Sequence, residues 1–156
     1  MRQLLGDSLP LQFRQPEFEV YAIRASPHEL PATPDRLALL DAQVPAPSAQ
    51  PGQPIVWRTH WAVNGASPQR RLKLFFHVLN DKSEVIADDD REDLNFATLS
   101  EGASFYQISR LTLPPDLPSG QYPVEVGWYN PETGERLNRA DGSDRTLLPS
   151  LEVTAP

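Results

Sequence analysis

The acidic run at positions 88–93 is the part of the sequence whose residue types and spacing point most directly to chemistry. Ca²⁺ binds several oxygen ligands that lie close together in a flexible loop. The candidate metal ligands are therefore Asp88, Asp89, Asp90 and Asp93. Their spacing does not match an EF-hand loop, and Arg91 places a competing cation among them. A solvated loop whose charges discourage edge-to-edge sheet aggregation is the favoured interpretation.

Aromatic side chains are the second group of candidate functional residues, because exposed rings can stack on sugars. Trp57 and Trp61 alternate with Ile55, and Trp128 alternates with Val124 and Val126, so these tryptophans are expected to fill a core. Tyr129 falls on the opposite face of its strand and is the aromatic residue expected to be exposed. The predicted ligand-binding residues, for a glycan, are Tyr129, Glu125, His60 and Arg58.

No catalytic residue is predicted. The sequence contains neither a G-x-S-x-G elbow nor a phosphate-binding loop. Glu125 and Glu135 are a conceivable carboxylate pair for glycoside cleavage, but we expect both to be solvent-facing cross-strand partners. We expect His77 to be a half-buried, hydrogen-bonded strand residue. A hydrolase triad assembled across the fold stays open as an alternative, because triads need no sequence adjacency.

Composition sets the limits within which these residues act. The chain has 156 residues, the size of one ordinary domain, and its 17 prolines would interrupt almost any long helix. The net charge of −7 disfavours nucleic acids and anionic lipid surfaces as partners. With no cysteine there is no thiolate nucleophile and no disulfide framework. No cofactor is predicted, and no apolar stretch approaches the length of a membrane span.

The run from Leu111 to Leu137, LTLPPDLPSGQYPVEVGWYNPETGERL, indicates the elements that position these residues. It reads as the end of a strand, a proline corner, a strand from Tyr122 and a tight turn at 130–134. A tyrosine after such a corner is typical of immunoglobulin-like sandwiches, where its hydroxyl bonds back to the backbone. The sequence therefore predicts an all-β, immunoglobulin-like antiparallel β-sandwich of about seven to nine strands.

Further strands are expected at 18–24, 37–44, 55–63, 72–80 and 84–87, with loops at 25–35 and 45–54. Residues 1–16 lack a sustained period and are expected to form a tail or a first edge contact. Residues 17–156 are expected to form a single β-sandwich domain.

Four stretches carry a family resemblance, namely LALLDAQV, PGQPIVWRTHWA, LKLFFHVLND and the run from Leu111 to Leu137. The segment from about Arg36 to Val153 resembles the C-terminal β-sandwich domain of bacterial membrane glycosyltransferases of the protein-mannosyltransferase-like superfamily. The resemblance implies a non-catalytic, extracytoplasmic accessory module, with a glycan or a protein of the cell envelope as partner. A carbohydrate-binding module is the alternative function, and the oligomeric state stays open.

Overall fold

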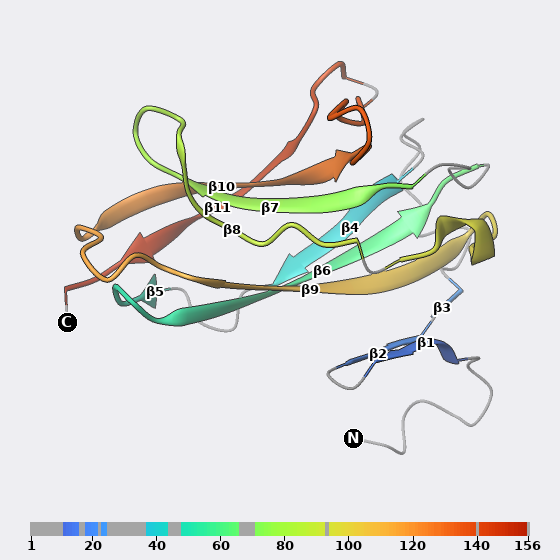
Figure 1. Cartoon of the computed structure of the whole chain (residues 1–156), viewed down its shortest axis with the longest axis horizontal. Coiled ribbons are helices and arrows are strands. Elements are labelled where there is room, and N and C mark those ends of the chain that lie inside the picture. The colour runs from blue at the N-terminus through green and yellow to red at the C-terminus, as the bar shows by residue number, and fades with distance from the viewer. Residues whose placement is uncertain are drawn as a thin grey trace.

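The computed structural model describes residues 11–15, 18–21, 23–24, 37–43, 48–65, 71–92, 94–139 and 141–155, with side chains from residue 37 onward. Two β-sheets pack face to face in these residues, and each has one apolar face turned toward the other (Figure 1). The predicted all-β sandwich is confirmed. The two packed sheets contain nine strands, the upper end of the predicted range.

The five-stranded sheet has the order β5-β11-β10-β7-β8. Its strands are β5 (Ser48–Ala49), β7 (Lys73–Leu79), β8 (Val85–Asp88), β10 (Gly120–Tyr129) and β11 (Thr146–Val153). All neighbours run antiparallel except β5 and β11, which are parallel. Strand β10 lies in the middle, so it has a neighbour on each side.

The four-stranded sheet has the order β3-β9-β6-β4. Its strands are β3 (Ile23–Arg24), β4 (Leu37–Gln43), β6 (Pro54–Val63) and β9 (Ala103–Thr112). The long ladder between β6 and β9 pairs Pro54 with Thr112 and continues to Ala62 opposite Ser104. Strands β1 (Leu11–Gln15) and β2 (Phe18–Tyr21) form a separate antiparallel pair near β9 (Figure 1).

The core lies between the two sheets and is built from alternate residues of the central strands. Trp57 and Trp61 are 2% and 3% exposed, so the predicted inward face of β6 is confirmed. Val124, Val126 and Trp128 are buried as predicted, whereas Tyr122 is only partly buried at the rim. Trp128 makes an edge-on contact with Trp61 at a ring separation of 5.4 Å.

The proline corner before β10 has the predicted bond. Tyr122 donates its hydroxyl hydrogen to the carbonyl oxygen of Pro118 at 2.8 Å. At the other end of β10, the turn at 130–134 places Gly134 at a φ of 73°, and its N–H bonds to the carbonyl of Asn130 at 2.8 Å. Proline stiffness on one side and glycine freedom on the other therefore fix the length of β10.

From residue 37 onward, three elements were not anticipated from the sequence. Strand β5 lies inside the expected proline-rich loop at 45–54, where only two residues pair with β11. Strand β11 contains Pro149, which lies where the pairing with β10 shifts register and needs no ladder donor. A 3₁₀ turn, η1 (Phe96–Thr98), is capped by the Asn95 side chain and buries Phe96 in the core.

Candidate functional site

The strongest concentration of interacting charges lies on the outer face of the five-stranded sheet, around Glu125. Glu125 is only 3% exposed, so the expectation that it faces solvent is wrong. Strand parity does place it on the outer face, opposite His77 of β7 and Leu147 of β11. Its burial comes from side chains that cover it, which strand alternation alone does not predict.

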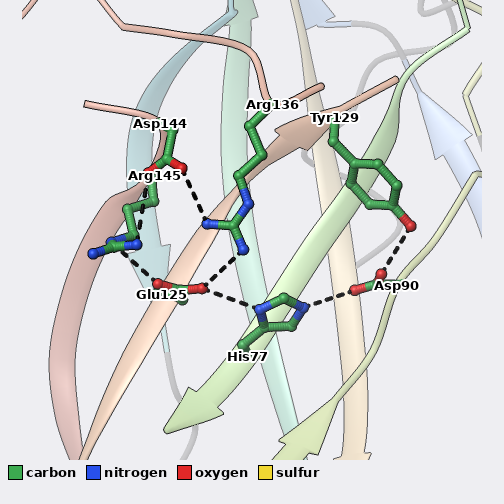
Figure 2. Close-up of polar contacts among 7 residues, drawn as sticks. All are labelled: His77, Asp90, Glu125, Tyr129, Arg136, Asp144 and Arg145. Atoms are coloured by element: carbon green, nitrogen blue, oxygen red, sulfur yellow. Dashed lines mark hydrogen bonds and ion pairs between the residues drawn. The ribbon is translucent and has the colours of Figure 1, made fainter. Parts of the chain in front are cut away.

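His77 connects two carboxylates across this face (Figure 2). Its Nδ1 atom lies 3.1 Å from Glu125 Oε1, and its Nε2 atom lies 3.2 Å from Asp90 Oδ1. Each ring nitrogen of His77 therefore lies against one carboxylate oxygen. The other Asp90 oxygen accepts a hydrogen bond from the Tyr129 hydroxyl at 2.9 Å. His77 is half-buried and hydrogen-bonded, as predicted.

The segment between β10 and β11, described at 130–139 and 141–145, supplies the covering side chains. The Nη2 atom of Arg136 donates to Glu125 Oε1 at 3.3 Å, and its Nη1 atom donates to Asp144 at 3.4 Å. Nε of Arg145 forms an ion pair with Glu125 Oε2 at 3.2 Å, without hydrogen-bond geometry. Two arginines therefore reach one buried carboxylate, and we call this group, with His77, Asp90 and Tyr129, the Glu125 cluster (Figure 2).

Arg136 packs on the outer face of the sheet by stacking its guanidinium on the Phe75 ring, next to Gly127. Gly127 pairs with Phe75 across β10 and β7, and a Cβ atom at position 127 would lie only 2.5 Å from Phe75 Cζ. The Phe75 ring therefore occupies the space above the glycine, and the Arg136 guanidinium lies over that ring at 4.2 Å. The backbone also holds the segment, because Leu137 donates its N–H to the Trp128 carbonyl at 2.7 Å.

Burial and hydrogen bonding alter the titration of two groups at the edge of the cluster. Partial burial, with the hydrogen bond to Asp90, raises the pKa of Tyr129, and the nearby Lys73 opposes this. The pKa of Lys73 is itself raised, mainly through its hydrogen bond with Tyr129. The neutral phenol and the charged ammonium are thus the forms that the fold favours.

The carboxylates of the acidic run have separate partners. Asp89 accepts from Arg91 Nε at 2.7 Å and from the backbone N–H of Arg110 at 2.6 Å, whereas Asp90 belongs to the Glu125 cluster. Asp88 is exposed at the end of β8, and Asp93 lies outside the described residues. Among the described side chains, no group of three or more His, Asp or Glu residues is placed to hold a metal ion.

The four predicted ligand-binding residues do not form one site. Tyr129 and Glu125 project from β10 in the five-stranded sheet, whereas Arg58 and His60 project from β6 in the four-stranded sheet. Because the sheets pack through their inner faces, these pairs lie on opposite outer surfaces of the sandwich (Figure 1). The Tyr129 hydroxyl is bonded to Asp90 within the cluster, so its polar tip is not free to contact a sugar.

Arg58 and His60 instead join Tyr106, a residue of β9 that the sequence did not single out. The His60 and Tyr106 rings stack at 4.3 Å, and the Arg58 guanidinium lies over Tyr106 at 5.1 Å. Beside them on the same outer face, Val56 and Ile108 are 36% and 37% exposed. We call this surface, formed by Val56, Arg58 and His60 of β6 with Tyr106, Ile108 and Arg110 of β9, the β6–β9 face.

A small cavity opens where the two sheets meet beside the 130–145 segment. Its walls include Leu37, Trp61, Trp128, Leu137 and Arg145, and its volume is about 20 Å³. A space of that size holds about one water molecule and is too small for a sugar ring. This cavity therefore offers no room for a saccharide.

Sequence reasoning missed Arg136, Asp144 and Arg145 as members of the Glu125 cluster. They lie in a charged stretch whose composition is typical of a solvated loop. The stretch lacks the sequence periodicity of a strand or helix, so the directions of its side chains cannot be predicted. Tyr106 was missed because the residue types of β9 do not follow its burial: Gln107 is buried, whereas Ile108 faces outward. The remaining signal is strand parity, which places Tyr106 on the face opposite buried Phe105 and Leu111.

Comparisons with known proteins give low similarity throughout. No protein-family model matches the chain, and no curated protein matches it. Among solved structures, the crystal structure of the C-terminal domain of Wzt aligns with a TM-score of 0.49 at 18% identity, covering 84% of this chain and 81% of that one. Spo0M, a sporulation control protein from Bacillus subtilis, aligns with a TM-score of 0.44 at 16% identity, covering 78% and 50%.

No helix in the described residues is long and apolar enough to cross a membrane.

Proposed function

We propose that this chain is a non-catalytic recognition module that works on the extracytoplasmic side of a cell, as an accessory domain of a membrane glycosyltransferase or another cell-surface system. The family resemblance of residues 36–153 supports that setting. The geometry of the Glu125 cluster supports a role without catalysis. Each Glu125 oxygen contacts an arginine of the same chain. One Asp90 oxygen contacts His77, and the other contacts Tyr129.

One observation carries the recognition role, namely the contrast between the two outer surfaces of the sandwich. The five-stranded sheet is covered around Glu125 by the 130–145 segment. Both outer surfaces expose apolar side chains, with Leu147 of β11 at 67% on the five-stranded sheet. The β6–β9 face differs because its exposed apolar side chains, Val56 and Ile108, lie beside two arginines that make no ion pair among the described residues. An exposed sheet face with apolar, aromatic and cationic groups is suited to contact with a partner.

A saccharide is the partner that Tyr106 favours. This ring is half-buried and held in place by stacking against His60, and within the described part of the chain its hydroxyl has no hydrogen-bond partner. An aromatic side chain with an apolar body and a free polar tip can contact both the C–H groups and the hydroxyls of a sugar. Of the four residues predicted to bind a saccharide, Arg58 and His60 belong to the proposed binding face. Glu125 and Tyr129 lie on the other sheet and are not part of it.

A binding and turnover experiment tests this function. The chain should retain envelope saccharides on a glycan array with weak affinity, and the same saccharides should remain intact after long incubation. Tyr106→Ala should abolish retention without lowering the melting temperature by more than a few degrees. Tyr129→Phe is the matched control and should bind as the unaltered chain does. Hydrolysis that survives rigorous purification would contradict the proposal and favour the hydrolase alternative.

A further inference from the structure

Two arginines differ from the other arginine side chains of the described residues because they have no carboxylate partner. Arg58 donates to the amide oxygen of Gln43, and Arg110 makes no ion pair within the described part of the chain. The remaining described arginines pair with acids, as Arg71 does with Glu92, Arg91 with Asp89, Arg136 and Arg145 with Glu125, and Arg139 with Asp141.

Both of these arginines lie on the β6–β9 face. Arg58 pairs in register with Ile108, and Val56 pairs with Arg110, so the two arginines are diagonal neighbours on adjacent strands. Such neighbours have Cα atoms about 7–8 Å apart, within reach of one small anion for side chains of this length. No acidic side chain is among the six residues of the face. The nearest acid in register is Asp41 on β4, which pairs with His60 and accepts from Gln43 at 2.6 Å.

Asp89 accepts from the backbone N–H of Arg110, yet neither arginine side chain makes an ion pair within the described residues. Two exposed cations without such a pair are unusual in a chain of net charge −7. Acids would be expected at these outward strand positions if the arginines served only solubility, because opposite charges across strands stabilise a sheet. Their absence leaves a local positive surface that attracts an anion which the rest of the protein repels.

We propose that the β6–β9 face binds an acidic saccharide, with its carboxylate held by Arg58 and Arg110. This inference rests on the recognition function proposed above and specifies its ligand. The planar guanidinium matches a carboxylate with two parallel hydrogen bonds, and its contacts are stronger than those of neutral donors. Val56 and Ile108 would contact the apolar side of the sugar ring, and the Tyr106 hydroxyl would bond to a ring substituent.

A long polyanion fits this face less well than a short acidic saccharide. The positive surface is confined to two arginines, whereas the chain as a whole carries excess negative charge that repels extended polymers. Exposed apolar side chains beside the cations also favour a ligand with C–H surfaces. The interaction should therefore weaken with salt, yet less steeply than a nucleic-acid complex.

The test compares a short oligogalacturonate with the same oligosaccharide after its carboxyl groups have been reduced to alcohols. Titration calorimetry on the full chain should show binding of the acidic form and at least tenfold weaker binding of the reduced form. Each variant removes a charge-assisted hydrogen bond to the carboxylate, so Arg58→Gln and Arg110→Gln should each weaken binding of the acidic form by about tenfold. Lys82→Gln removes a positive charge from the exposed turn between β7 and β8 and should leave binding unchanged.

The outcomes separate this inference from the function on which it rests. Equal binding of the acidic and reduced forms, still lost with Tyr106→Ala, would overturn the inference and leave saccharide recognition standing. Binding of neither form, nor of any other saccharide on the array, would overturn both. Binding of polyglutamate as tight as that of oligogalacturonate would also overturn the inference, because the face would then recognise acidic peptides. Melting temperatures of both arginine variants within a few degrees of the unaltered chain establish that they fold.

Discussion

Gly127 is the residue on which the packing above β10 depends most directly. Its missing side chain leaves room for the Phe75 ring, and Arg136 lies over that ring. An aromatic residue opposite a strand glycine shields the backbone that the glycine would otherwise expose. The Glu125 cluster therefore relies on an uncharged contact as well as on its ion pairs.

Gly127→Ala is expected to destabilise the fold. The new Cβ atom would lie 2.5 and 2.6 Å from two Phe75 ring atoms and 3.1 Å from the Asp144 carbonyl, so the ring must move. Overpacking of this kind costs about 1–3 kcal/mol, measured by urea unfolding. Gly120→Ala is the matched control, because its Cβ would make only an ordinary contact of 3.7 Å with Tyr122. Equal stability of the two variants would contradict this account of Phe75.

Tyr129 is expected to make stability fall at alkaline pH. Its pKa is raised in the folded chain, first by burial and then by the bond to Asp90. The resulting stabilisation is complete below the unfolded value near 10 and is lost as the pH rises through the higher folded value. Lys73, whose pKa is also raised, acts in the same direction from about pH 10.5 upward.

Urea unfolding between pH 8 and pH 11.5 measures this effect. Tyr129→Phe should flatten the alkaline decline, because it removes the titrating phenol and the partner of Lys73. Tyr106→Phe is the control on the opposite surface and should leave the decline as it is. A decline of the same size in Tyr129→Phe would assign the alkaline effect to other groups.

At the scale of elements, the 130–145 segment is held to the sheet by charges that converge on one buried carboxylate. Glu125 is 4% exposed at its side chain, whereas the side chains of Arg136 and Arg145 are 29% and 47% exposed. If the ion pairs break, the two arginine side chains can therefore be hydrated more easily than the Glu125 carboxylate. This asymmetry makes Glu125 the group whose loss matters most to the segment.

Glu125→Gln is expected to loosen the 130–145 segment. Removing one partner of a buried ion pair costs about 3–5 kcal/mol, and partial exposure of both arginines places the effect near the lower value. Urea unfolding should show this loss, and limited proteolysis should show faster cleavage within the segment. Glu152→Gln, which removes an exposed charge from β11, should change neither measurement. Unchanged proteolysis of Glu125→Gln would mean that the backbone bonds and the Arg136–Phe75 contact hold the segment without the Glu125 ion pairs.

Strand β10 shows how far sequence reasoning reaches. Alternation along the strand and the prolines before it were sufficient to predict the strand and the inward direction of Val124, Val126 and Trp128. The tyrosine after the corner predicted a bond from its hydroxyl back to the backbone, and Pro118 is the acceptor. The same alternation placed Glu125 on the outer face correctly. It did not predict burial, because a strand pattern gives the direction of a side chain and not what covers it.

The rest of the site depends on parts of the chain whose sequence has no regular alternation of apolar and polar residues. Arg136 and Arg145 reach Glu125 through a turn-rich segment whose path depends on tertiary contacts. Strand β5 has two residues, too few for any pattern, and its parallel partner is more than a hundred positions away in the sequence. Tyr106 was missed for another reason, since buried Gln107 and exposed Ile108 reverse the hydrophobic alternation of β9. Its stacking partner His60 lies on the neighbouring strand, and only a known register shows that the two residues are opposite each other.

For the whole molecule, the described charges differ between the two outer surfaces: the acids around Glu125 contact cations on one, whereas Arg58 and Arg110 make no ion pair among the described residues on the other. The acidic run at 88–93 contributes to the first arrangement, because Asp89 and Asp90 contact Arg91 and His77. A calcium ion would have to replace those bonds before it could gain several ligands. The run therefore acts as a set of internal acceptors at the edge of the sheet.

Thermal melts in excess chelator and in millimolar calcium are accordingly expected to coincide. A ligand that binds only the folded chain raises the melting temperature with its occupancy, so an absent site gives no shift. Asp89→Asn with Asp90→Asn should lower stability equally in both conditions, through lost bonds to Arg91, His77 and Tyr129. Asp81→Asn with Asp116→Asn removes two exposed charges elsewhere and serves as the control. A calcium-dependent rise that only the Asp89 and Asp90 pair abolishes would restore the ion site.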